Sequence, residues 1–125
     1  MTNAKTKAET SILLNNIIES IEEKKGKGLI SLDFINIKNS VCEYFIICHG
    51  TSKVHVEAIS DFIIENVKMK TKTAPWHKEG FENAEWILID YANIIVHVFQ
   101  EETRKFYKLE SLWADADIKH YKDEE

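Results

Sequence analysis

The stretch from Trp86 to Phe99 constrains the fold of this chain more than any other. It contains two apolar runs, Trp86–Ile89 and Ile94–Phe99, joined by four residues that include turn-forming Asp90 and Asn93. This pattern, rich in Ile and Val, predicts a β-hairpin. Each run is nearly continuous in apolar side chains rather than alternating, which is typical of strands that are covered on both faces. Helices, or another molecule, must therefore cover this hairpin.

Three segments have the apolar periodicity of amphipathic helices. They run from about Thr10 to Lys25, from about Lys53 to Lys68 and from about Glu101 to Trp113. Thr10 or Ser11 would cap the first helix, and Thr51 or Ser52 the second. The apolar side of the third would consist of Phe106, Leu109, Leu112 and Trp113.

The remaining apolar segments are typical of strands. Residues 29–37 mostly alternate and then change phase, which indicates either a bulge near Phe34 or burial of both faces. Residues 43–49 are more continuously apolar, as in a central strand, and a short strand precedes the hairpin. The order of elements predicts a single α/β (α+β) domain over residues 1–125, with a mixed sheet of about five strands flanked by helices. Residues 1–9 and 116–125 are expected to be flexible.

The composition limits the kind of partner and the compartment. A net charge of −5 argues against direct, sequence-specific nucleic-acid binding and suits a basic protein partner. No apolar run approaches the roughly 18 residues of a membrane span, and the first residues have no signal-peptide core. We therefore expect no membrane association and a cytoplasmic protein, or one of an organelle matrix if a transit segment was removed. Cys42 and Cys48, in or beside one strand, are expected to be reduced, buried thiols.

One turn raises the possibility of an enzyme. Gly50-Thr51-Ser52, between a strand and a helix, could hold a phosphate, and it is similar to the turn of nucleotidyltransferases. Those enzymes also need two or three carboxylates on neighbouring strands to hold magnesium, whereas residues 73–77 carry none and Asp90 stands alone. The histidines have no zinc-type spacing, and His97, between two valines, is expected to make a structural hydrogen bond. We expect no catalytic residue, cofactor or metal site, and keep a nucleotidyltransferase-type enzyme as the less favoured alternative.

Several short runs in order along the chain carry a family resemblance. They are Leu32-Asp33, Glu43–Ser52, Glu79-Gly80, Trp86–Tyr91, Val96–Phe99 and Phe106–Asp115. Together they resemble the ribosomal silencing factor family, also called RsfS or Iojap, over about Thr10 to Ala116. The chain departs from the pattern at His49, where Ser or Thr is usual, and at Ala92-Asn93, where glycine–aspartate is usual. Asn93 still tolerates a left-handed turn conformation, so we expect the hairpin to be retained.

The resemblance implies a nucleotidyltransferase-like topology without the catalytic carboxylates. It also implies a protein that binds the large ribosomal subunit through its fourteenth protein, sterically blocks association with the small subunit and so represses translation. Organelle relatives act in large-subunit assembly, which is the alternative function, and the free protein would form a homodimer.

The family pattern also implies which residues bind the partner. They are Glu79, Trp86, Leu88, Asp90 and Tyr91. For Trp86 a role as a core aromatic stays open, and for Asp90 a role as a turn acid that accepts backbone hydrogen bonds.

Overall fold

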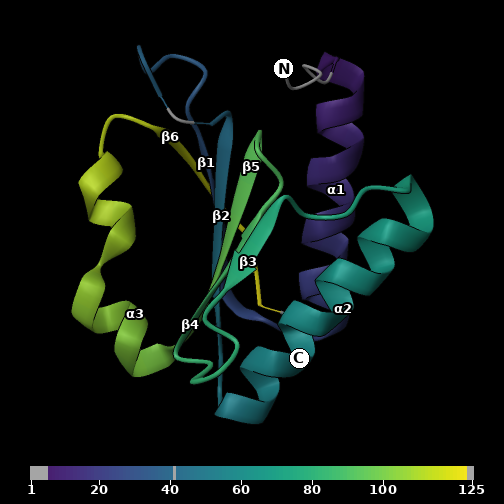
Figure 1. The fold of residues 1–125 in the computed structure, drawn as a ribbon. Helices are drawn as coiled ribbons and strands as arrows, with labels where there is room; N and C mark the ends of the chain where they lie inside the picture. Colours follow the sequence, from purple (N-terminus) through teal and green to yellow (C-terminus); the bar gives the residue numbers. More distant parts are fainter. Residues whose placement is uncertain (1–5, 41, 124–125) are drawn as a thin grey trace.

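The computed structural model of the protein describes residues 6–40 and 42–123, which form a six-stranded sheet with helices on both sides (Figure 1). The helices are α1 (Lys7–Glu23), α2 (Lys53–Thr71) and α3 (Glu101–Tyr107), and a 3-10 helix, η1 (Leu109–Trp113), follows α3. The strands are β1 (Lys27–Asp33), β2 (Tyr44–Gly50), β3 (His77–Glu79), β4 (Trp86–Asp90), β5 (Ile94–Gln100) and β6 (Asp117–His120). The predicted mixed sheet is confirmed, with one strand more than expected.

The predicted hairpin is β4–β5, and its second strand lies at the centre of the sheet. The strand order is β3-β4-β5-β2-β1-β6. The central strands β5 and β2 run parallel, and each other neighbouring pair is antiparallel. Both β2 and β5 are almost entirely buried, as their continuous apolar runs predict.

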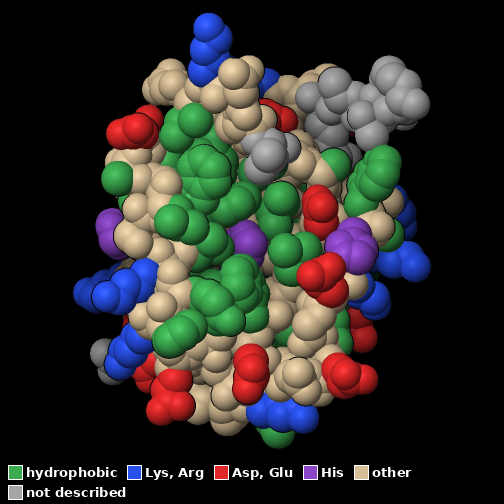
Figure 2. Space-filling view, turned by 60° about the vertical axis from the view of Figure 1, so that its left-hand side comes forward, with side chains coloured by type: hydrophobic (Ala, Val, Ile, Leu, Met, Phe, Trp, Pro, Cys, Tyr) green, Lys and Arg blue, Asp and Glu red, His purple; other side chains and the backbone are tan. Residues whose placement is uncertain are grey.

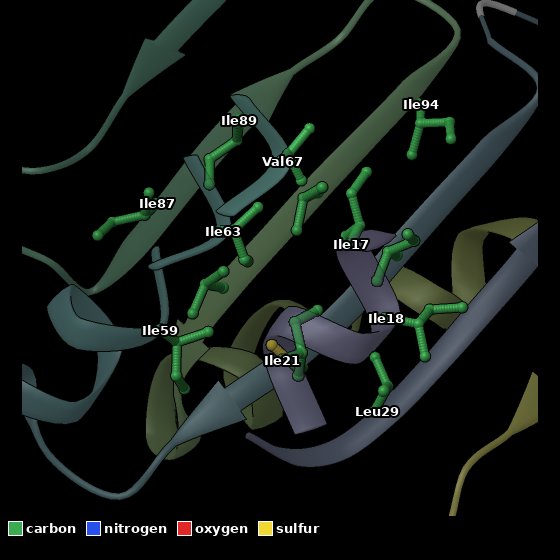
Figure 3. Packing of buried hydrophobic residues seen from close by; sticks show 14 of the residues in the cluster. Ile17, Ile18, Ile21, Leu29, Ile59, Ile63, Val67, Ile87, Ile89 and Ile94 are labelled. Atoms are coloured by element: carbon green, nitrogen blue, oxygen red, sulfur yellow. The ribbon is translucent and has the colours of Figure 1, made fainter. Parts of the chain in front are cut away.

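Helices α1 and α2 cover one face of the four inner strands, β4, β5, β2 and β1 (Figure 1). Their apolar stripes interlock above β4 and β5, where Figure 3 shows side chains from all four elements in one cluster. A buried hydrogen bond of 2.9 Å from Asn66 Nδ2 to Ser20 Oγ joins the two helices. Because both polar groups are paired, this contact fixes the helices against each other without leaving a buried group unsatisfied.

The other face is partly covered by the shorter α3 and η1 (Figure 1). Its core is largely aromatic: the Phe34 ring lies 4.9 Å from that of Phe45 and 5.1 Å from that of Trp113. The predicted helix over 101–113 is wrong as a continuous element, because Lys108 has left-handed backbone angles (φ 48°, ψ 50°) that end α3. Leu109 and Trp113 pack on the sheet, whereas Phe106 and Leu112 are more than 70% exposed.

The C-terminal segment differs from the prediction. Residues Asp117–His120 form β6, which pairs antiparallel with β1, and Ala116 is buried. The expected flexible tail over 116–125 is therefore wrong for this strand, and residues 124 and 125 lie outside the described residues. All four β6 side chains are exposed, so hydrogen bonding to β1, rather than an apolar pattern, holds the strand in place.

The first helix also begins earlier than predicted. Thr6 Oγ1 accepts from the Glu9 N–H (3.1 Å) and the Glu9 carboxylate accepts from the Thr6 N–H (2.9 Å), which together make a capping box. Thr10, expected as a cap, is instead a buried residue inside α1. The expected flexibility of residues 1–9 does not hold for the part in α1, and residues 1–5 lie outside the described residues.

Strand β1 shows which of the two readings of residues 29–37 is right. The strand ends at Asp33, and its pairing irregularity lies between Lys27 and Ile30 rather than near Phe34. Leu29 belongs to the core under α1 and α2, whereas Ile30 and Leu32 belong to the opposite core. Both faces of β1 are therefore buried, but the change of apolar phase at Ile35 and Ile37 falls beyond the end of the strand, where Ile35 is 67% exposed.

Helix α2 follows the prediction closely. Ser52 caps it by accepting from the His55 N–H at 3.1 Å, and Lys72, with left-handed angles, ends it. Within residues 6–40 and 42–123, neither this helix nor any other combines the length and the apolar character needed to cross a membrane.

Both cysteines are free, buried thiols, as predicted. Burial raises the pKa of each thiol to about 12, so both are protonated at neutral pH.

We expect Ile17→Ala to lower the free energy of unfolding by about 2–5 kcal/mol, because Ile17 is fully buried between α1, α2 and the sheet. Urea unfolding followed by circular dichroism measures this. Ile12→Ala is the matched control, since Ile12 lies on the same helix and is 54% exposed. Equal losses in the two variants would contradict the packing of α1 described above.

Candidate functional site

One part of the sheet surface has no helix over it, and we call it the open face. It is the side of β3, β4 and β5 that faces away from α1 and α2, and it consists of His77, Glu79, Trp86, Leu88, Asp90, Ile95 and His97. Strand register brings them together: Leu88 pairs with Glu79 and His97, and Asp90 pairs with His77 and Ile95. Directly paired residues lie on the same face of a sheet. Figure 2 shows this side of the molecule, with hydrophobic side chains gathered in the middle and charged side chains of both signs around them.

Trp86 is the largest side chain of the open face, and its orientation is fixed. Its Nε1–H donates to His97 Nδ1 at 3.0 Å. Its ring packs on Phe99, at 4.8 Å between centroids, and on Tyr107, at 5.1 Å. Trp86 is half-buried, so one part of the indole belongs to the aromatic core and the rest faces solvent. The reading of Trp86 as a core aromatic is thus correct for part of the side chain.

Two carboxylates lie on the open face. Asp90 Oδ1 accepts from the Ala92 N–H at 2.7 Å, so the reading of Asp90 as a turn acid is correct, while the residue stays partly exposed. Glu79 is exposed and pairs with the His77 ring on the same short strand. Glu79 lies beside Leu88 on the edge strand β3, and Asp90 lies two residues beyond Leu88 on β4, so both carboxylates add negative charge around Leu88.

Tyr91 does not belong to this group. It is 2% exposed, packs with the core under α1 and α2, and burial raises the pKa of its hydroxyl. Its expected contact with a partner is therefore not available in this structure. Alternation along the chain carries the signal that was missed: residues 86, 88 and 90 lie on one face, so residue 91 falls on the other.

The hairpin turn also differs in detail from the prediction. Ala92, not Asn93, has the positive φ, at 75°. The Asn93 side chain instead donates to Thr10 Oγ1 at 3.0 Å and ties the turn to α1. This contact anchors the turn to α1 although alanine, at position 92, stands where glycine is usual.

The Gly50–Ser52 turn uses its own polar groups. The Thr51 N–H donates to His55 Nδ1 at 2.9 Å, and the His55 N–H donates to Ser52 Oγ at 3.1 Å. A phosphate at this turn would have to displace the His55 ring. No group of three or more His, Cys, Asp or Glu side chains placed to hold a metal ion occurs in the part of the chain that the structure describes.

His49, where the chain departs from the family pattern, has a structural role. His49 Nδ1 accepts from Arg104 Nη1 at 3.0 Å, and Arg104 Nη1 also donates to the Gly28 carbonyl at 2.7 Å. Burial, and then the Arg104 charge, lowers the pKa of His49. The neutral ring thereby links β2 to α3.

His97 makes the structural hydrogen bond that the sequence predicts. It is 3% exposed, and its Nδ1 accepts from Trp86, so the remaining proton is on Nε2. Nε2 is buried and has no partner among the described residues. Burial lowers the pKa of His97 to about 4, so the ring is neutral at pH 7. A protonated ring would lose the acceptor that holds Trp86.

We expect the His97 ring to make folding pH-dependent between about pH 6.5 and 4. In this window the unfolded chain takes up a proton at His97 and the folded protein does not, so the free energy of unfolding falls as the pH falls, by up to about 3 kcal/mol. Urea unfolding at several pH values measures the slope. His97→Asn should have a smaller slope than wild type, and His120→Asn, on the exposed strand β6, should keep the wild-type slope. Equal slopes in wild type and His97→Asn would contradict the burial of a neutral His97.

Comparison with known proteins gives relatives over nearly the whole chain. The chain is 35% identical over 104 residues to the ribosomal silencing factor RsfS of Halalkalibacterium halodurans. The aligned residues make up 83% of this chain and 87% of that protein. It is 34% identical over 74 residues to the mouse protein named mitochondrial assembly of ribosomal large subunit protein 1, covering 58% of this chain and 32% of that one.

The fold has a solved counterpart as well. A crystal structure of a protein from Chromobacterium violaceum has a TM-score of 0.77 and 30% identity, and the match covers 82% of this chain and 84% of that chain. The family model described as "Ribosomal silencing factor during starvation" matches residues 6–125. The chain therefore belongs to the ribosomal silencing factor family.

Proposed function

We propose that this protein binds the large ribosomal subunit through the open face, docks there on the subunit's fourteenth protein and prevents the small subunit from joining. The proposal rests mainly on one observation. Four of the five residues expected from the family pattern, Glu79, Trp86, Leu88 and Asp90, lie together on a sheet surface that faces away from α1 and α2, and none of the four is fully buried. The names of the relatives, which refer to ribosome silencing and large-subunit assembly, support the same partner.

The proposed mechanism is steric and needs no chemistry. A domain seated on the joining face of the large subunit occupies space that the small subunit would fill, and translation falls. Binding energy in such interfaces concentrates in a few buried aromatic or apolar anchors, here Trp86 and Leu88. The Glu79 and Asp90 carboxylates would orient the approach of a basic ribosomal protein.

The same proposal includes the setting in which the protein acts. We place it in the cytoplasm, where it would meet the subunits before they join, and the free protein would form a homodimer.

Assembly of the large subunit is a second candidate function, favoured by the name of the mouse relative. Co-sedimentation with mature subunits supports silencing, whereas binding to precursor particles alone supports assembly. Magnesium-dependent nucleotide binding would instead favour an enzyme.

We expect Trp86→Ala to weaken binding to purified large subunits about 30-fold or more, because it removes the largest apolar anchor of the open face. Co-sedimentation measures the binding, and circular dichroism confirms folding. Trp76→Ala is the matched control, since Trp76 is 70% exposed and precedes β3, outside the open face. Wild-type binding by a folded Trp86→Ala variant would remove Trp86 from the interface.

We expect Asp90→Asn to weaken the same binding about two- to fivefold at low salt, and by less as salt rises, because it removes a charge at the rim of the interface. The amide oxygen of Asn still accepts from the Ala92 N–H, so the turn is retained. Asp61→Asn, an exposed carboxylate on α2, removes the same charge from the opposite layer and should have no effect. A loss that is equal at all salt concentrations would contradict an electrostatic role for Asp90.

A further inference from the structure

A small pocket opens beside Trp86, between the start of β4 and α3. Its volume is about 150 Å³, and its lining residues are Gly80, Asn83, Glu85, Trp86, Thr103 and Tyr107. A cavity of this size admits a group as large as benzene, which means one side chain of a partner rather than a separate large ligand. Because Trp86 belongs to both the pocket and the open face, the pocket extends that face towards α3.

Two aromatic rings form the apolar wall of the pocket. The Trp86 and Tyr107 rings lie 5.1 Å apart between centroids, tilted by 49°. The hydrogen bond to His97 holds the indole, and Tyr107 is 53% exposed, so part of its ring remains free for contact. Aromatic faces attract cations, and they attract them more strongly where water is partly excluded.

Glu85 gives the pocket its charge. Its carboxylate is exposed and has no ion-pair partner within the described residues, and none of the lining residues is basic. Its backbone is held in place, because the Glu85 carbonyl accepts from the Gln100 N–H at 2.8 Å. The pocket therefore combines a carboxylate on an anchored backbone with two aromatic rings.

We propose that this pocket receives a Lys or Arg side chain of the protein that docks on the open face. The aliphatic part of that side chain lies along Trp86 and Tyr107, and its cationic end faces Glu85. This inference rests on the function proposed above, and it adds the chemistry of one contact on the partner. The Glu85 carboxylate would repel a phosphate group of ribosomal RNA from the same position. The net charge of −5 on the whole chain would add to this repulsion.

The test uses purified large ribosomal subunits as the probe and co-sedimentation of full-length variants as the readout. We expect Glu85→Gln, which keeps the shape of the side chain, to weaken binding about three- to tenfold at low salt and less at high salt. Tyr107→Ala should weaken binding to a similar degree, and Tyr107→Phe, which keeps the ring, should weaken it less than Tyr107→Ala does. Glu65→Gln removes the same charge from an exposed position on α2 and should have no effect.

The outcomes separate this inference from the proposed function. If wild-type protein does not bind large subunits, both are overturned. If wild type binds and Trp86→Ala does not, while Glu85→Gln and Tyr107→Ala bind as wild type does, the docking face stands and the pocket inference is overturned. Tighter binding by Glu85→Gln would place a phosphate, not a basic side chain, at the pocket and would also overturn it.

Discussion

The register of the β4–β5 hairpin is the constraint on which the rest of the structure depends. It places Ile87 and Ile89 under α1 and α2, and it places Trp86 and Leu88 on the opposite side. A slip of one residue would exchange these two sets, because successive side chains of a strand face opposite sides. The loop before β4 supports this register: Gly80 has a φ of 90°, and a Cβ there would lie 2.1 Å from the Trp86 carbonyl oxygen. Only glycine fits this approach.

The two faces of the sheet are covered unequally, and this difference separates the larger core from the surface proposed for binding. Two long helices bury one face almost completely. On the other side the left-handed turn at Lys108 shortens α3, so that the aromatic core around Phe34, Phe45 and Trp113 covers only part of the sheet. Strands β3 and β4 are left with an apolar and acidic surface, which a monomer would not need for its own core. A partner can occupy that surface without disturbing the larger core.

The Trp86–His97 hydrogen bond connects the core to the proposed interface. A tryptophan with a free indole would lose conformational entropy on binding, whereas Trp86 is already held by His97, Phe99 and Tyr107. The bond requires a neutral His97, and burial keeps it neutral at pH 7. The buried His97 thus holds the Trp86 side chain in one orientation, and Trp86 is one of the residues that the family pattern implies for binding.

Local sequence determined much of the fold. The hairpin, the central strand β2, the helix α2 with its Ser52 cap and the reduced thiols all follow from periodicity, capping chemistry and residue spacing, which act over a few neighbouring residues. The capping box at Thr6 and Glu9 is equally local, although the prediction placed the cap later.

Tertiary structure alone decided the pairing of β6, the break at Lys108 and the set of residues on the open face. Strand β6 has no buried side chain, and its place depends on backbone groups of β1 that are distant in sequence. The open face likewise exists because pairing brings β3, β4 and β5 side by side, and no local pattern specifies which strands become neighbours.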